Sequence, residues 1–397
     1  MFTPVTRPVR QHGGRHHGRD GRSPLLLAAA LVVAVPGLLV SACSGQTGSG
    51  APGGDAVAAA GRAATTGKAP AAARRPSAVR AVRLLAQAAQ AAIVTSYQGE
   101  EVVTRWSGGS GSVLVSNVWH VSGGQTVTQT LDAEASTGSQ PYMSADSDGR
   151  APEGVLGVTF PLVQLLETHY VVAYAGSGTA DNRTAQVVEA WRADGSLAAR
   201  YWLDDATRLP LEREIYDSGA HVIGRDVFIN LGLASQGAAP ADARASAAAQ
   251  EPWTDPLSEA QLLALRARGW QIPLQLPGGL SLFTGAETEA TTGTVLDLGY
   301  SDGLAVVSVF EQRGALAATL AGWRKTTVDG HVIFVAEPAG RSLTWSGRGM
   351  VYTLMADAPP QTVNAVVGAL PHDGPTGFWK RMSRGLVRLA SWVNPFH

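Results

Sequence analysis

The 397-residue sequence predicts an α+β protein whose sheets are antiparallel. Strand-like runs outnumber helical ones, and tight turns such as Asp194-Gly195 and Asp329-Gly330 join them. Two stretches rich in Ala, Gly, Pro and Ser, residues 43–76 and 234–257, interrupt this pattern. With 45% hydrophobic and 16% charged residues, the chain can bury one or two cores. We expect two α+β domains, residues 77–233 and 258–371.

Residues 1–42 are predicted to be a lipoprotein signal peptide. Five Arg precede the apolar run Leu25–Val40, which at about 16 residues is short for a membrane-spanning helix. Ser41 and Ala42 then precede Cys43, and small residues before a cysteine are typical of the bacterial lipobox. We therefore expect Cys43 to be lipidated. The alternative is an ordinary signal peptide or single-pass anchor with an incidental cysteine.

Residues 43–76 are predicted to form a flexible tether with a root-mean-square reach of roughly 30 Å. Its formal GxGxxG match, Gly48–Gly53, has no strand before it and no helix after it, so no dinucleotide cofactor is predicted. Because the five Arg and one Asp of residues 1–42 contribute +4 to the total of −1, the rest of the chain carries −5. This balance argues against nucleic acid as a partner.

The first domain should open with a helix capped by Ser77, followed by strands and a short helix over Phe160–Tyr170. The strand Val113–Val121 places apolar side chains on both faces, as a strand covered on both sides would. One reading is a ligand groove, and the alternative is a helix-covered core without a ligand. The candidate groove residues are Val113, Val115, Trp119, Trp191 and Trp202.

The second domain should open with a helix that begins in the capping box Ser258-x-x-Gln261 and ends near Gly269. Alternating strand signals follow, and a last helix is predicted over Pro359–Leu370. This order of elements gives the second domain its own antiparallel sheet.

Asp204 and Asp205 are the only candidates for a catalytic acid pair. A glycosidase-type pair needs two carboxyl groups that face each other at least about 5 Å apart. Adjacent strand residues instead point to opposite faces, and "DDATRLP" is good turn chemistry. We therefore expect a hairpin corner. The sequence has no GxSxG, HExxH, CxxC or P-loop pattern and its histidines are scattered, so it predicts no catalytic residue, metal site or cofactor.

Residues 372–397 are predicted to form a basic amphipathic tail. At helical spacing, its apolar side chains form one stripe opposite four cations, a pattern typical of membrane-surface helices. The alternative is that the stripe packs on its own C-terminal domain or on a partner. The membrane-facing candidates are Phe378, Trp379, Met382, Leu386, Leu389 and Val393.

Three segments resemble the RseB/MucB family of sigma factor regulators: "SYQGEEVV", "RYWLDDATRLPLEREIYDSGAHV" and "YSDGLAVVSVFEQ". They occur in the family's order and, with the segments around them, cover roughly residues 82–370. Arg208 stands where the family's turn usually has Gly, which should lengthen or reshape the corner. The residues that carry the resemblance are Tyr97, Gly99, Arg200, Tyr201, Trp202, Leu203, Asp204, Tyr300, Ser301, Asp302 and Gly303.

The resemblance implies an N-terminal antiparallel β half-barrel with helices on its concave face, similar to lipoprotein carriers, and a smaller C-terminal α+β domain. It implies a binding protein, not an enzyme, that shields the extracytoplasmic segment of a transmembrane anti-sigma factor from proteolysis in envelope stress. Release is expected when an acyl amphiphile occupies the N-terminal domain. With lipidated Cys43, the protein would sit on the extracytoplasmic face of the cytoplasmic membrane. The alternative function is a lipid-binding or lipid-carrying lipoprotein.

Overall fold

The computed structural model describes residues 75–107, 110–123, 126–131, 143–146, 155–233, 240–241, 256–290, 293–328, 330–336 and 342–373. The predicted signal peptide, Cys43, most of the linker and the membrane-facing tail candidates, from Phe378 to Val393, lie outside these residues. Within them, no helix is long and apolar enough to cross a membrane.

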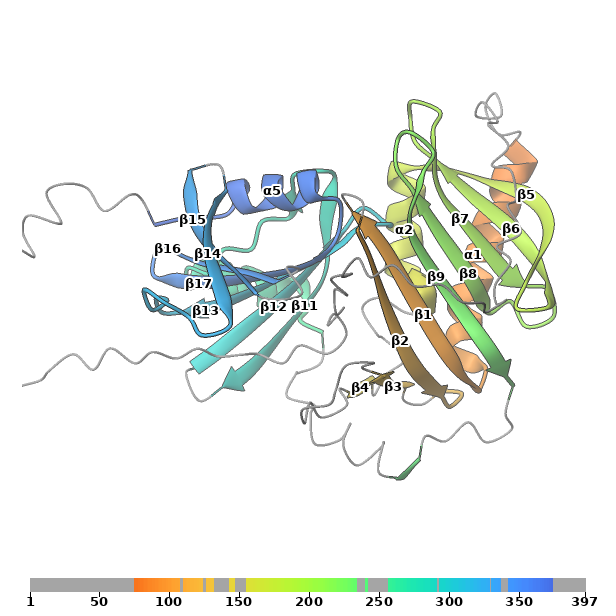
Figure 1. The fold of residues 1–397 in the computed structure, drawn as a ribbon, viewed down its shortest axis with the longest axis horizontal. Helices are drawn as coiled ribbons and strands as arrows, with labels where there is room; N and C mark the ends of the chain where they lie inside the picture. Colours follow the sequence, from red (N-terminus) through yellow and green to blue (C-terminus); the bar gives the residue numbers. More distant parts are fainter. Residues whose placement is uncertain are drawn as a thin grey trace, which may run out of the picture.

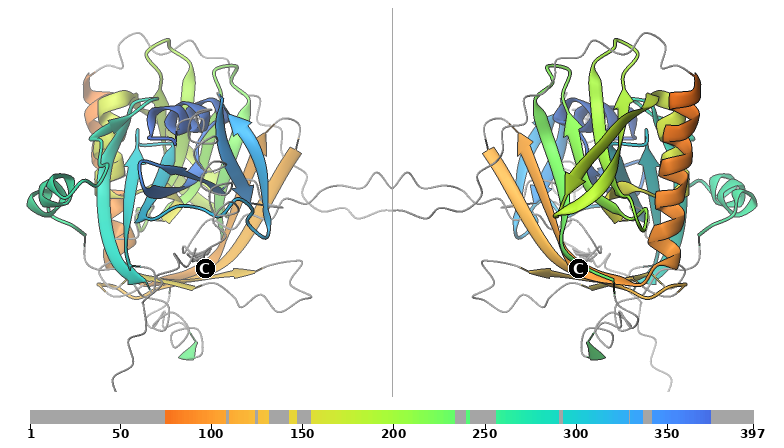
Figure 2. Two further views of the ribbon diagram at one scale, coloured as in Figure 1. Left: turned by 90° about the vertical axis from the view of Figure 1, so that its left-hand side faces the viewer. Right: turned by 90° about the vertical axis from the view of Figure 1, so that its right-hand side faces the viewer.

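The N-terminal domain, from α1 (Arg75–Val94) to β9 (Val222–Gly232), is built on a nine-stranded antiparallel sheet. Its strand order is β4-β3-β2-β1-β9-β8-β7-β6-β5, so β9 lies between β1 and β8. The sheet curls into a half-barrel with α1 and α2 on its concave face, which confirms the expected fold class (Figure 2). The other elements are β1 (Tyr97–Ser107), β2 (Ser110–His120), β3 (Thr126–Leu131), β4 (Met143–Asp146), η1 (Val155–Gly157), α2 (Phe160–His169), β5 (Val171–Ala180), β6 (Arg183–Trp191), β7 (Leu197–Asp204) and β8 (Pro210–Tyr216).

Helix α1 packs closely on the sheet because its buried stripe is rich in alanine. Ala81, Leu84, Leu85, Ala88 and Ala89 recur at helical spacing and are all buried. The helix begins at Arg75, so the prediction that Ser77 is its N-cap is wrong. The Ser77 hydroxyl instead donates to the carbonyl of Tyr174 in β5 at 3.2 Å and accepts from its N–H at 3.1 Å. The Ser77 hydroxyl therefore bonds to the backbone of the edge strand β5 and does not cap the helix.

The C-terminal domain, from α4 (Glu259–Ala267) to α5 (Pro360–Ala369), has an eight-stranded antiparallel sheet beside the first (Figure 1). Its strand order is β10-β11-β12-β13-β17-β16-β15-β14. The predicted capping box is confirmed, since Ser258 and Gln261 each accept from the other's backbone N–H. The strands are β10 (Gln275–Leu276), β11 (Leu280–Ala290), β12 (Gly293–Ser301), β13 (Val306–Arg313), β14 (Trp323–Val328), β15 (His331–Ala336), β16 (Ser342–Gly347) and β17 (Met350–Asp357).

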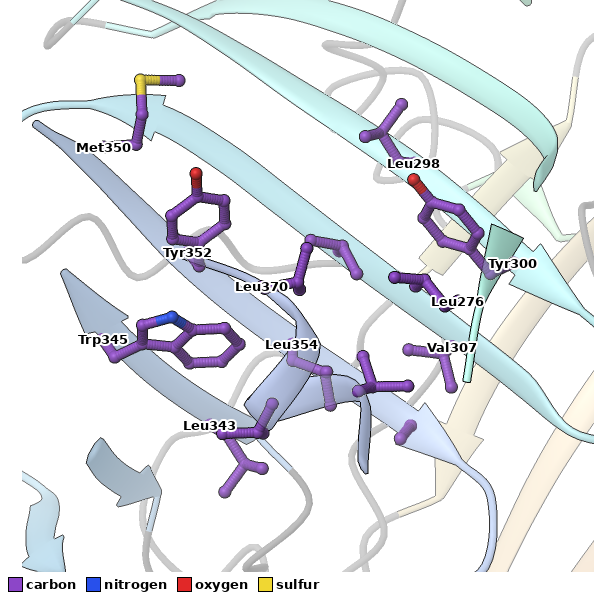
Figure 3. Close-up of a cluster of buried hydrophobic side chains, with 14 of the residues drawn as sticks. Leu276, Leu298, Tyr300, Val307, Leu343, Trp345, Met350, Tyr352, Leu354 and Leu370 are labelled. Carbon is purple, nitrogen blue, oxygen red and sulfur yellow. The ribbon is translucent and has the colours of Figure 1, made fainter. Parts of the chain in front are cut away.

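The core of the C-terminal domain is built around large side chains from the central strands (Figure 3). The rings of Trp345 and Tyr352 stack with their centroids 5.6 Å apart, and neither side chain is exposed. Leu354 lies beside them, and Val307 continues the same core beyond Leu354. Trp345 also donates its indole N–H to the carbonyl of Pro371 at 3.0 Å, which fixes the segment after α5 against the sheet.

Candidate interdomain site

The turn between β12 and β13 of the C-terminal domain packs against the N-terminal domain. Leu304 in this turn is 4% exposed and packs in the same cluster as Leu166 and Tyr201. Beside it, the Tyr170 hydroxyl donates to Oδ2 of Asp302 at 2.6 Å. Burial and the neighbouring Asp302 carboxylate raise the pKa of Tyr170, so the phenol stays protonated and acts as the donor. The turn thus contributes both an apolar and a polar contact.

Only glycine fits at position 303. Its φ of 99° lies in the left-handed region, and a Cβ there would collide with the backbone of Leu166 in α2. Hydrogen bonds inside the turn also fix its conformation. Asp302 Oδ1 accepts from the N–H groups of Leu304 and Ala305 at 2.9 and 2.8 Å, and Ser301 Oγ accepts from the N–H of Gly303 at 2.8 Å. Three residues singled out by the sequence resemblance, Ser301, Asp302 and Gly303, therefore build the contact between the domains.

A second contact between the domains is ionic and centres on Arg105 of β1. Arg105 donates from Nε to Oδ1 of Asp357 at 2.8 Å and from Nη2 to Oδ2 at 2.6 Å. The same guanidinium pairs with Asp226 of β9, which Arg213 of β8 also contacts. Burial alone would lower the pKa of Arg105, but Asp357 and Asp226 raise it above its ordinary value. Two arginines and two aspartates thus neutralise one another's charge in a largely buried cluster.

A groove of about 1230 Å³ is lined by residues of both contacts, Tyr170 and Asp302 at one and Arg105 and Asp357 at the other. Both domains contribute apolar and polar side chains to its lining. A groove of this size, mostly apolar with a few polar groups, can take a peptide segment or an amphiphile. Its other lining residues include Val328, Ile333, Val335, Leu343 and Val363 from one domain, and Trp106, Arg192, Ile215, Asp217 and Ile223 from the other.

The candidate groove residues chosen from the sequence do not line this groove. Val113 is 54% exposed, Val115 and Trp119 are half-buried, and Trp191 and Trp202 are buried. The helix-covered face of β2 instead carries Val118 and His120. Since both faces of this strand are apolar in the sequence, its periodicity could not identify the covered one.

Trp202 has a different environment from the one expected. It packs with Ala180, Ala185, Val187 and Leu211 in a cluster separate from the one that contains α1. Its neighbour Tyr201 faces the helices, and burial raises the pKa of Tyr201 to about 12. The groove formed by Val113, Val115, Trp119, Trp191 and Trp202 stays a prediction, and Trp202 is packed among its cluster neighbours.

The hairpin corner predicted at Asp204 and Asp205 is confirmed. Asp204 Oδ2 accepts from the N–H and hydroxyl of Thr207 at 2.9 and 2.7 Å, and Arg183 donates to Oδ1 at 2.9 Å. Burial would raise the pKa of Asp204, but these donors lower it below its ordinary value. Arg208 has a φ of 70°, a left-handed conformation in which glycine is favoured. Arg208 therefore adopts a backbone conformation that glycine would adopt without strain, and the expected lengthening or reshaping of the corner stays a prediction.

The remaining resemblance residues make contacts inside their own domains. Tyr97 stacks on His120 with ring centroids 5.0 Å apart, and a side chain at Gly99 would collide with the ring of Phe228. Arg200 pairs with Glu189 across β6 and β7 at 2.7 Å. In the other domain, the Tyr300 hydroxyl donates to the carbonyl of Pro273 at 3.0 Å. Leu203 is fully buried beside Tyr201.

Sequence reasoning missed the residues of the ionic contact. Arg105, Arg213, Asp226 and Asp357 lie in four different strands, so no local spacing connects them. The available signal was a charge within each apolar strand run, and such charges are costly unless they are paired.

No family model matches the chain, and no curated protein matches it. Among solved structures, it is similar to MucB in complex with MucA(peri), at 22% identity over 74% of this chain and 100% of that chain, with a TM-score of 0.41. It is also similar to MucB alone, at 22% identity over 73% and 95% of the two chains, with a TM-score of 0.42. The LolA superfamily protein NE2245 from Nitrosomonas europaea is a more distant neighbour, at 8% identity over 72% and 96%, with a TM-score of 0.17.

Proposed function

We propose that this chain is a regulator of the RseB/MucB type, which binds the extracytoplasmic segment of a transmembrane anti-sigma factor and controls its proteolysis during envelope stress. The observation that carries the proposal is that Ser301, Asp302 and Gly303 build a contact between the two domains. These residues bear the sequence resemblance, and they join the domains at one wall of the interdomain groove. A single-domain carrier would have no need of them. The protein acts by binding, without catalysis.

The interdomain groove is the proposed binding surface for the partner segment. Val328 and Val363 offer a partly exposed apolar wall for its side chains, while Arg192 and Asp217 offer charged groups at the opposite domain. An acyl amphiphile would use the same apolar wall and so compete with the partner. This wall also favours the second candidate function, a lipid-binding or lipid-carrying lipoprotein.

We place the protein on the extracytoplasmic face of the cytoplasmic membrane, with Cys43 as its lipid anchor and the basic tail as a second membrane contact. Anchoring both proteins on one membrane raises their effective concentration, so even micromolar affinity in solution would suffice. The tail would then set orientation more than affinity.

The test is a binding titration of a soluble fragment that starts at Arg75 against the ectodomain of an anti-sigma factor encoded beside it. We expect saturable binding, slower cleavage of the ectodomain by its membrane-proximal protease, and reversal of both by an added acyl amphiphile. Deleting residues 258–397 should weaken binding far more than deleting the tail from Gly377. If the fragment does not bind the ectodomain at high micromolar concentration, the proposal of a regulator is rejected. If it then still binds an amphiphile, a lipid-carrying function is favoured.

A further inference from the structure

A polar hollow of about 340 Å³ lies where α1 faces the corner between β7 and β8, away from the interdomain groove. Three arginines line it, Arg80 and Arg83 from α1 and Arg208 from the corner, together with the single carboxylate of Asp205. Three guanidinium groups against one carboxylate leave the hollow with an uncompensated charge of +2. Leu84, which is 5% exposed, contributes the apolar part of its lining.

Fixed contacts hold the first of these arginines in place. The guanidinium of Arg80 lies 3.7 Å from the ring centroid of Tyr174 and donates to Oε1 of Gln186 at 2.9 Å. Gln186 is 8% exposed, and it also accepts from the Tyr174 hydroxyl at 2.8 Å and donates to Asp205 at 2.9 Å. These bonds preorganise the hollow, because the buried amide fixes residues from the helix, the sheet and the corner together.

The third arginine adopts a backbone conformation that its side chain disfavours. Arg208 has a φ of 70°, where glycine would be free of strain, and its Nη1 donates to Asp205 at 3.0 Å. Strained non-glycine residues gather at functional sites, where a particular side chain is needed in spite of the strain. Arg83 has no hydrogen-bond or ion-pair partner among the described residues, so its guanidinium is available to a ligand.

We propose that this hollow binds a phosphate group, either of a phospholipid headgroup or of a free phosphate. Guanidinium groups bind oxyanions through paired N–H donors. Three arginines line this one hollow, which matches the several oxygens of a phosphate better than the two of a carboxylate. The net charge of +2 also favours the negatively charged oxygens of a phosphate group.

The test uses the full lipid-anchored chain in a neutral detergent and isothermal titration calorimetry at constant ionic strength. The two probes are inorganic phosphate and glycerophosphoglycerol, the soluble headgroup of phosphatidylglycerol. We expect saturable binding of at least one probe. The probe that binds at least tenfold more tightly identifies the source, a free phosphate or a lipid headgroup.

The informative variants are Arg208→Gly and Arg83→Gln, which should each weaken binding of the preferred probe at least tenfold. Arg208→Gly removes the guanidinium while relieving the backbone, so its thermal unfolding midpoint should be equal to or above that of the wild type. Arg268→Gln removes one exposed cation from the other domain and should bind like the wild type. The proposal is overturned if neither probe binds, if Arg208→Gly binds like the wild type, or if Arg268→Gln loses as much affinity.

Discussion

Arg105 and Asp357 are 252 residues apart in sequence, and the guanidinium of one holds both carboxylate oxygens of the other. This paired geometry makes their bond directional as well as ionic. It ties the first strand of the half-barrel to the end of the last strand of the other sheet. The orientation of the two domains therefore depends in part on an arginine that also pairs within its own sheet.

Asp357→Asn should loosen the domains while leaving each domain folded. It removes one charge from the network, and the cost should be about 2 kcal/mol, less than for a fully buried pair because 19% of the Asp357 side chain is exposed. Small-angle scattering should show a larger radius of gyration, and urea unfolding should separate into two transitions. Glu189→Gln removes a pair with Arg200 inside the N-terminal domain and should leave the scattering unchanged.

Gly303→Ala should separate the domains at the β12–β13 turn and weaken anti-sigma binding at least tenfold. The added methyl group would collide with Leu166, in addition to the backbone cost of about 1 kcal/mol for a left-handed conformation. Gly349→Ala is the matched control, because Gly349 also has a positive φ of 78° but open space around it. If both variants bind the partner ectodomain equally well, the turn has no part in recognition.

Glu311→Gln should stabilise the C-terminal domain above about pH 5, by a few kcal/mol at neutral pH. Glu311 is fully buried, and one of its oxygens accepts from the N–H of Gln271 while the other has no partner. Burial raises its pKa to about 8 from 4.5. The folded protein therefore keeps a proton that the unfolded chain releases, and stability falls as the pH rises from 4.5 to about 8.

The measurement is urea unfolding of wild type and Glu311→Gln between about pH 4 and pH 9. The difference in unfolding free energy should grow with pH through this window and become constant above about pH 8. Glu167→Gln, at an exposed position of α2, should show no such trend. A difference that does not vary with pH would mean that Glu311 is ionised in the folded protein.

The double substitution of Asp204→Asn and Asp205→Asn should destabilise the corner without abolishing regulation. Asn can still accept hydrogen bonds, but the ion pair of Asp204 with Arg183 and that of Asp205 with Arg208 are lost. The expected cost is on the order of 1 kcal/mol per weakened local bond, seen as a lower thermal midpoint. Complete loss of signalling by a double variant that folds normally would restore the catalytic interpretation of these acids.

Cys43→Ser should block lipid addition and leave a precursor that migrates differently on a gel. Two acyl chains bury enough methylene groups, at about 0.8 kcal/mol each, to hold a protein stably on a membrane. Metabolic labelling with a fatty acid measures the outcome directly. Label in the Cys43→Ser protein would place the lipid elsewhere and reject the lipobox assignment.

The sequence was informative wherever neighbours in the chain determine the structure. The hairpin corner at Asp204, the capping box at Ser258 and the antiparallel sheets all follow from local spacing, and each is observed. The interdomain groove depends on contacts such as Arg105 with Asp357, which only tertiary packing brings together. The covered face of β2 was also undetermined, because both of its faces are apolar. The N-cap predicted at Ser77 was also wrong, because the Ser77 hydroxyl bonds to the backbone of β5, a contact that local sequence does not show.

The last strand of each sheet lies in the interior of that sheet. β9 pairs with both β1 and β8, and β17 pairs with both β13 and β16. During synthesis, neither sheet can complete its strand pairing until its final strand has been made. Until then, the neighbouring strands keep unpaired edges. Strand order therefore delays the closure of each sheet and leaves aggregation-prone edges exposed until its last strand is available.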